Sequence, residues 1–138
     1  MKAFKLSAEI QYGITELDGQ HQELIDLIGS LNRYVESPNL SEIEKIFDRL
    51  QELMIIHFSD EEMAMKRTEY PDVADHGVQH QNLLKEARNI FEIVKSRGKL
   101  SDYDINESLD KIVRHMLLSD GPFKAHLRRA QVREQNIV

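Results

Sequence analysis

Apolar residues that recur at spacings of three and four dominate this sequence, and they predict long amphipathic helices. Only three prolines and six glycines interrupt the 138 residues. No alternating β-branched pattern, which would indicate strands, competes with the helical one. The chain is therefore predicted to be all-α.

Capping and breaking residues mark the expected ends of four helices. Ser41 and Glu44 have the spacing of a capping box, so a helix is expected to begin there. Gly98 is expected to close a helix, and Gly121 with Pro122 to stop another. The four predicted helices run over about 17–35, 41–65, 76–98 and 101–121, with residue 101 or 102 capping the last.

Four amphipathic helices with short connections bury their stripes most economically as an up-down-up-down four-helix bundle. We predict a single domain over 1–138, with an N-terminal arm of about 1–16 and a bundle of about 17–121. The tail, 122–138, is expected to form a short C-terminal helix. No linker or internal repeat divides the chain.

Charge and hydropathy argue against a membrane protein, a secreted protein and a nucleic-acid-binding protein. The longest apolar runs, such as 53–56, fall far below the ~18 residues that span a bilayer. The N-terminus lacks the apolar core of a signal peptide, so we expect a cytoplasmic protein with no membrane contact. A net charge of −6 argues against a nucleic-acid partner. The basic residues of the tail are expected to form a solvated helical face: Lys124, Arg128, Arg129 and Arg133.

Polar residues stand on the apolar stripes, where the bundle has its core. Five of the six histidines and a glutamate occupy such positions. Burying so many polar groups without partners is unfavourable, and a bound metal ion removes that cost. The six residues are His21, His57, Glu61, His76, His80 and His115.

The spacing of these residues suits convergence on a metal. Residues 57 and 61 stand at i and i+4, as do 76 and 80, so each pair projects from one helix face. Asp120 follows His115 by five positions, so it joins the set only if the helix is distorted between them. Gly121 and Pro122 place a helix end or kink at that point.

Five imidazoles and two carboxylates exceed the needs of one tetrahedral zinc and suit two six-coordinate ions bridged by carboxylates. The zinc-protease pattern HExxH is absent, because Gly77 follows His76. The Glu-x-x-His motif of ferritin-like proteins is absent as well. Nitrogen-rich ligation suits iron that cycles between its ferrous and ferric states, and this favours dioxygen as the molecule that the site binds.

These segments together resemble the hemerythrin family, and within it the single-domain bacteriohemerythrins. The resemblance covers roughly residues 12–125. The matching pieces are GITELDGQH at 13–21, HFSDEE at 57–62, Tyr70-Pro71, HGVQH at 76–80, and His115 with Asp120.

The resemblance implies a centre of two iron ions with an oxo or hydroxo bridge. It assigns His76, His80 and His115 to one iron, His21 and His57 to the other, and Glu61 and Asp120 to both. The iron with two histidines would keep an open position that binds dioxygen reversibly, for storage, delivery or sensing. It therefore implies an oxygen-binding protein rather than an enzyme.

Apolar residues near the expected ligands are candidate walls of the oxygen pocket. Leu24 and Ile112 stand one turn from His21 and His115, and Phe58 follows His57. Ordinary core packing explains these three residues equally well.

Lys111 occupies a position where many family members carry tryptophan. It either extends to solvent or points inward, where it would wet the pocket and favour autoxidation. The alternatives are a di-iron enzyme that reduces peroxide or nitric oxide, for which Lys111 is the candidate proton donor, and a redox sensor that acts through a partner. His126 matches no ligand position and is expected to be exposed. The methionines at 54, 63, 65 and 116 are expected to fill the core.

Overall fold

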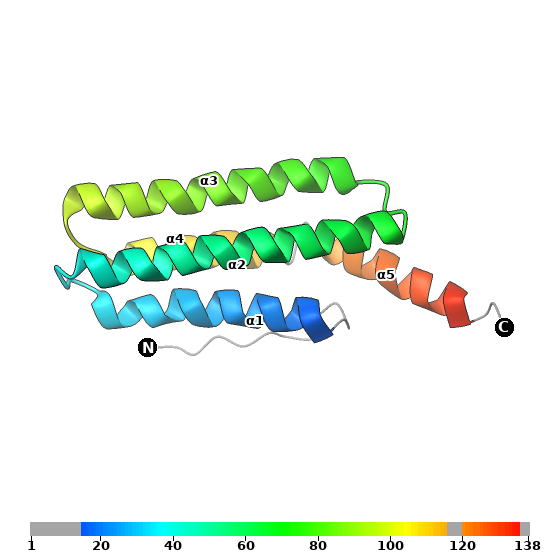
Figure 1. Cartoon of the computed structure of the whole chain (residues 1–138), viewed down its shortest axis with the longest axis horizontal. Coiled ribbons are helices and arrows are strands. Elements are labelled where there is room, and N and C mark those ends of the chain that lie inside the picture. Colours follow the sequence, from blue (N-terminus) through cyan, green and yellow to red (C-terminus); the bar gives the residue numbers. More distant parts are fainter. Residues whose placement is uncertain (1–14, 116–119, 136–138) are drawn as a thin grey trace.

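The computed structural model describes residues 15–115 and 120–135, and these ranges are helical apart from short connections (Figure 1). Helix α1 packs against α2 and α4, and α3 packs against the same two helices, which makes the predicted antiparallel bundle. Helix α5 extends past one end of the bundle (Figure 1). The elements are α1 (Thr15–Ser30), the 3-10 helix η2 (Leu31–Tyr34), α2 (Leu40–Arg67), α3 (Val73–Arg97), α4 (Asp102–Arg114) and α5 (Asp120–Gln135).

The start of α2 differs from the prediction. Asn39 caps this helix, because its side-chain oxygen accepts a hydrogen bond from the backbone N–H of Glu42 at 3.3 Å. Ser41 lies inside the first turn, so the expected capping box with Glu44 is wrong. Asparagine satisfies a free N–H of the first turn as well as serine does, and it stands two residues earlier.

The connection between α3 and α4 follows the prediction. Gly98 adopts the left-handed conformation, with φ of +85°, and its N–H donates to the carbonyl of Val94. Such a conformation is readily available only to glycine. Ser101 then caps α4 in a capping box with Asp104.

The end of α4 lies earlier than predicted. The α-helix ends at Arg114, and the hydrogen bonding at His115 is of the wider π type. Asp120 begins α5, so Gly121 and Pro122 stand in the first turn of a new helix instead of stopping α4. Proline is well tolerated there, because the first N–H groups of a helix have no intrahelical acceptor.

The core has two parts. The main cluster runs along the bundle and includes Ile28, Leu50 and Met54. A smaller cluster forms where α5 meets the other helices, and it consists of Leu17, Met65, Tyr70, Phe123 and Leu127. No helix of the described part is long and apolar enough to cross a membrane.

Several expectations about single residues are wrong, and those on α5 are wrong because this helix buries one of its faces. His126 is only 8% exposed, and Lys124 is 7% exposed, although both were expected to face solvent. Arg128 and Arg129 are exposed as expected. Met63 is 52% exposed, because it lies on the outer side of α2. The arm before residue 15, Met116 and the side chain of Arg133 lie outside the described part of the chain.

Candidate metal centre

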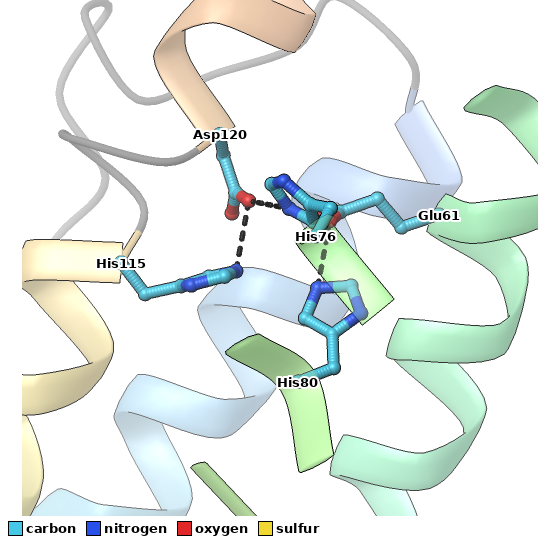
Figure 2. A group of neighbouring side chains, drawn as sticks. All are labelled: Glu61, His76, His80, His115 and Asp120. Carbon is cyan, nitrogen blue, oxygen red and sulfur yellow. Dashed lines mark hydrogen bonds and ion pairs between the residues drawn. The ribbon is translucent and has the colours of Figure 1, made fainter. Parts of the chain in front are cut away.

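The seven residues predicted to bind metal are all buried, and they lie together inside the bundle. They form two groups, and in each group ligand atoms of all members lie within 4.8 Å of one another. Figure 2 shows the larger group, with side chains from α2, α3, the C-terminal end of α4 and α5 pointing toward one another. One group is Glu61, His76, His80, His115 and Asp120; the other is His21, His57, Glu61 and Asp120.

Glu61 belongs to both groups because its two oxygens face different histidines. Its Oε1 lies 2.7 Å from Nε2 of His76 and 3.0 Å from Nε2 of His80. Its Oε2 lies 3.3 Å from Nε2 of His57. The carboxylate is fully buried, so its charge is shielded from solvent.

Asp120 repeats this arrangement from the first turn of α5. Its Oδ1 lies 2.7 Å from Nε2 of His76 and 2.9 Å from Nε2 of His115 (Figure 2). Its Oδ2 lies 3.5 Å from Nε2 of His21. Asp120 belongs to α5 and His115 follows the last residue of α4, so the two residues do not stand on one α-helix. Each carboxylate therefore offers one oxygen to each histidine group.

Gln20 fixes the orientation of His57. Its Oε1 accepts a hydrogen bond from Nδ1 of His57 at 2.8 Å, and its Nε2 donates to Oδ2 of Asp60 at 2.7 Å. Because Nδ1 carries the proton, Nε2 of His57 turns its lone pair toward the cluster. Sequence reasoning missed this role, although Gln20 stands directly before His21 in a matching segment.

Glu62 acts in the same way on the other group. Its Oε2 lies 3.1 Å from Nδ1 of His80 and accepts the hydrogen bond. Gly77 gives this carboxylate room, since a Cβ at that position would lie 3.0 Å from Oε1 of Glu62. The position of Glu62, directly after Glu61, was the only signal for this role in the sequence.

The electrostatics of the cluster favour charged carboxylates. Burial and the charge of Asp120 raise the pKa of Glu61, but the contacts with His57, His76 and His80 outweigh them and hold it well below its usual range. Burial also raises the pKa of Asp120, and contacts with His115, His21 and His76 lower it further than burial raises it. Two negative charges thus share a buried site.

The pKa values of His76 and His57 shift in opposite directions. Burial lowers the pKa of His76, but its contacts with Asp120 and Glu61 dominate and raise it to about 9. Burial, helped by the neighbouring His21, lowers the pKa of His57. A proton on His76 therefore neutralises part of the carboxylate charge, and a metal cation would take over this role.

The residues present fit a bound cation. Within the described part of the chain, the buried Nε2 atoms of His57, His80 and His115 make no hydrogen bond. They lie 3.3, 3.0 and 2.9 Å from carboxylate oxygens, but not in hydrogen-bonding geometry. Buried polar atoms of this kind need a partner, and imidazole nitrogens with carboxylate oxygens are good ligands for first-row transition metals.

A small apolar cavity of about 20 Å³ lies within the bundle. Met54, Leu83 and Ile112 line it, and each stands three residues, one helical turn, from a clustered histidine. Of the three predicted wall residues, Ile112 borders this cavity and the other two do not. Leu24 packs in the main core, and Phe58 stacks on the ring of His80 with centroids 3.9 Å apart.

Lys111 borders the same cavity but directs its charge outward. Its Nζ lies 3.8 Å from a carboxylate oxygen of Glu86 and 3.8 Å from one of Glu107. Its side chain is 35% exposed. Of the two orientations considered for this residue, the structure has the one in which the amine extends to the surface.

Comparison with known proteins agrees with this geometry. Residues 12–127, which include all the clustered side chains, match the family described as Hemerythrin HHE cation binding domain. The chain is 26% identical over 116 residues to a bacteriohemerythrin of Methylococcus capsulatus, which covers 84% of this chain and 86% of that protein. It is 32% identical over 108 residues to a bacteriohemerythrin of Campylobacter jejuni, with coverage of 73% and 74%.

Proposed function

This chain belongs to the hemerythrin family, and we propose that it holds two iron ions and binds dioxygen reversibly. The cluster would divide its ligands between the two ions, with an oxo or hydroxo group completing the bridge. His76, His80 and His115 would bind one iron, His21 and His57 the other, and Glu61 and Asp120 both.

The unequal division of histidines carries this proposal. Three imidazoles, two carboxylate oxygens and the bridge would be enough to satisfy a six-coordinate ion held by His76, His80 and His115. Only His21 and His57 would serve the other ion, which would leave it one ligand short of six. An open position separates a reactive metal site from a structural one. Iron supplies the electrons that reversible dioxygen binding needs.

The surrounding residues of the chain would hold this site rigid and dry. Gln20 and Glu62 orient His57 and His80 so that their Nε2 atoms face the metals. Phe58 covers one face of His80. The apolar cavity one turn away offers a small uncharged molecule a favourable surrounding close to the centre.

The position of Lys111 favours reversible dioxygen binding over the reduction of peroxide or nitric oxide. Reduction of peroxide or nitric oxide requires a proton donor beside the reacting molecule. Lys111 was the candidate donor, and its amine lies at the surface between Glu86 and Glu107. An oxygen-binding role in storage, delivery or sensing therefore fits the site better than an enzymatic one.

The test is the visible spectrum of the anaerobically reduced, iron-loaded protein through repeated cycles of air and deoxygenation. We expect two irons per chain and an oxygenated band that appears and disappears in each cycle. Asp120→Ala should lose iron from both positions, whereas Asp110→Ala, a change at an exposed aspartate of α4, should behave like the unmodified protein.

Three results would count against the proposal. A chain that retains no iron would refute the metal assignment. A band that forms once and decays to a stable ferric species would refute reversible binding. Sustained turnover with peroxide or nitric oxide would favour the enzyme instead.

A further inference from the structure

His126 is a buried histidine outside the metal cluster. It is 8% exposed, and its Nε2 lies 2.6 Å from the backbone carbonyl oxygen of Thr68. A carbonyl only accepts hydrogen bonds, so Nε2 carries a proton and donates it. This ring therefore makes a short, directional contact between α5 and a residue 58 positions away in the sequence.

The acceptor of this bond lies at the C-terminal end of α2. Thr68 is the C-cap of α2, where carbonyl groups lack the N–H partners that the helix interior provides. Helix α2 also carries Glu61, two turns before Thr68. Helix α5 begins with Asp120. The bond thus joins the helices that supply the two carboxylates shared by both histidine groups.

The ring of His126 is also part of the contact that seats α5 on the bundle. It packs against Tyr70 with ring centroids 5.2 Å apart and stacks at 6.4 Å on Phe123. Phe123 is fully buried, and Leu127 is 3% exposed. Apolar contacts of this kind hold the helix in place but tolerate sliding and rotation, whereas a hydrogen bond of 2.6 Å fixes one register.

We propose that His126 is a positioning residue for the metal centre: its hydrogen bond to Thr68 sets the register of α5 so that Asp120 reaches both histidine groups. This inference rests on the proposed function, in which Asp120 is a metal ligand. Because Asp120 belongs to both groups, a shift of α5 weakens both metal positions together.

Substitutions at residue 126 separate the hydrogen bond from simple packing. His126→Ala removes the donor. His126→Gln keeps an N–H donor at about the reach of Nε2, whereas His126→Asn keeps an amide that is one carbon shorter and cannot reach Thr68. The affinity of the full-length chain for Co²⁺ is measured by anaerobic titration, and hydrogen exchange of α5 amides is measured on the same samples.

We expect His126→Ala and His126→Asn to weaken both Co²⁺ equivalents by about 10-fold, the lower end of the effect of losing a direct partner of a ligand, because His126 acts on Asp120 only through the register of α5. They should also speed amide exchange in α5. His126→Gln should restore both properties. Unchanged Co²⁺ affinity in His126→Ala, or a failure of His126→Gln to exceed His126→Asn, would overturn the proposal.

Two further measurements keep the outcomes distinct. If the substituted chains do not fold, NMR of the unmodified protein decides, since the Nε2–H of His126 must exchange slowly, and more slowly still with Co²⁺ bound; rapid exchange overturns the inference. Asp120→Ala is titrated in parallel. If it binds Co²⁺ normally, the ligand assignment itself fails; if it loses affinity while His126→Ala does not, only the role of His126 fails.

Discussion

Removing the side chain of Gln20 should weaken one of the two metal positions selectively. In Gln20→Ala, Nδ1 of His57 loses its acceptor, and Asp60 loses the amide that binds it. His57 is 1% exposed, so water cannot readily replace the lost partner. The imidazole is then free to rotate or to change tautomer, and Nε2 no longer faces the metal in a fixed orientation.

The magnitude follows from this geometry. Loss of an outer partner reduces metal affinity by about 10- to 100-fold, or ~1.4 to 2.7 kcal/mol. The two bonds made by Gln20 are short, at 2.8 and 2.7 Å, and one of them satisfies a buried N–H. An unsatisfied buried donor costs about 1–3 kcal/mol. We therefore expect an effect in the upper part of the range, about 30- to 100-fold.

The assay is anaerobic titration of the metal-free protein with Co²⁺ against a competing chelator, which resolves two equivalents. His57 belongs only to the group with two histidines, so one equivalent should weaken while the other keeps its affinity. Gln22→Ala is the matched control, because Gln22 lies on the same helix and donates to Asp26 at the exposed surface. Equal loss in both equivalents, or an equal effect in the control, would refute the reasoning.

Three further predictions concern stability and pH. The pKa of His76 is raised to about 9, so protonated His76 stabilises the metal-free fold fully below pH ~6.5, and this contribution disappears as the pH rises through about 9. Metal binding must displace the same proton, so the apparent Co²⁺ affinity should rise between pH ~6.5 and about 9. A Co²⁺ affinity that does not change with pH over this interval would contradict the expected direction. Gly98→Ala should lower the free energy of unfolding by about 1 kcal/mol because of its φ of +85°, whereas Gly29→Ala, in open space within α1, should raise it by about 0.5–1 kcal/mol in denaturant titrations. Lys111→Met removes only surface ion pairs, so it should cost less than about 1 kcal/mol and leave metal content unchanged; loss of metal would show an inward role for the amine.

Much of the architecture could be predicted from periodicity. The apolar stripes place four helices, and the same spacing places His57 with Glu61, and His76 with His80, on the inner faces of their helices, since about 3.6 residues make one turn. The boundaries were less predictable. Asn39 and Ser41 are both good capping residues, and only the path of the chain before α2 selects the first of them.

Predictions failed where a residue depends on a distant helix. His126 and Lys124 have the polar character of a surface segment, and they are buried because one face of α5 packs against the end of the bundle. Nothing in the local sequence reports this packing. Glu62 and Gln20 were overlooked for the same reason, since their partners lie 18 and 37 positions away.

Spacing along one helix was enough to predict the helices and the inward-facing pairs at 57 and 61 and at 76 and 80. The packing of the helices establishes which oxygen of Glu61 and Asp120 faces which histidine, and which ring nitrogen of His57 points inward. It also decided the register of α5 that brings Asp120 into the cluster. The difference lies in the distance along the sequence: helical geometry is set between residues a few positions apart, whereas these contacts exist only after separate helices have packed.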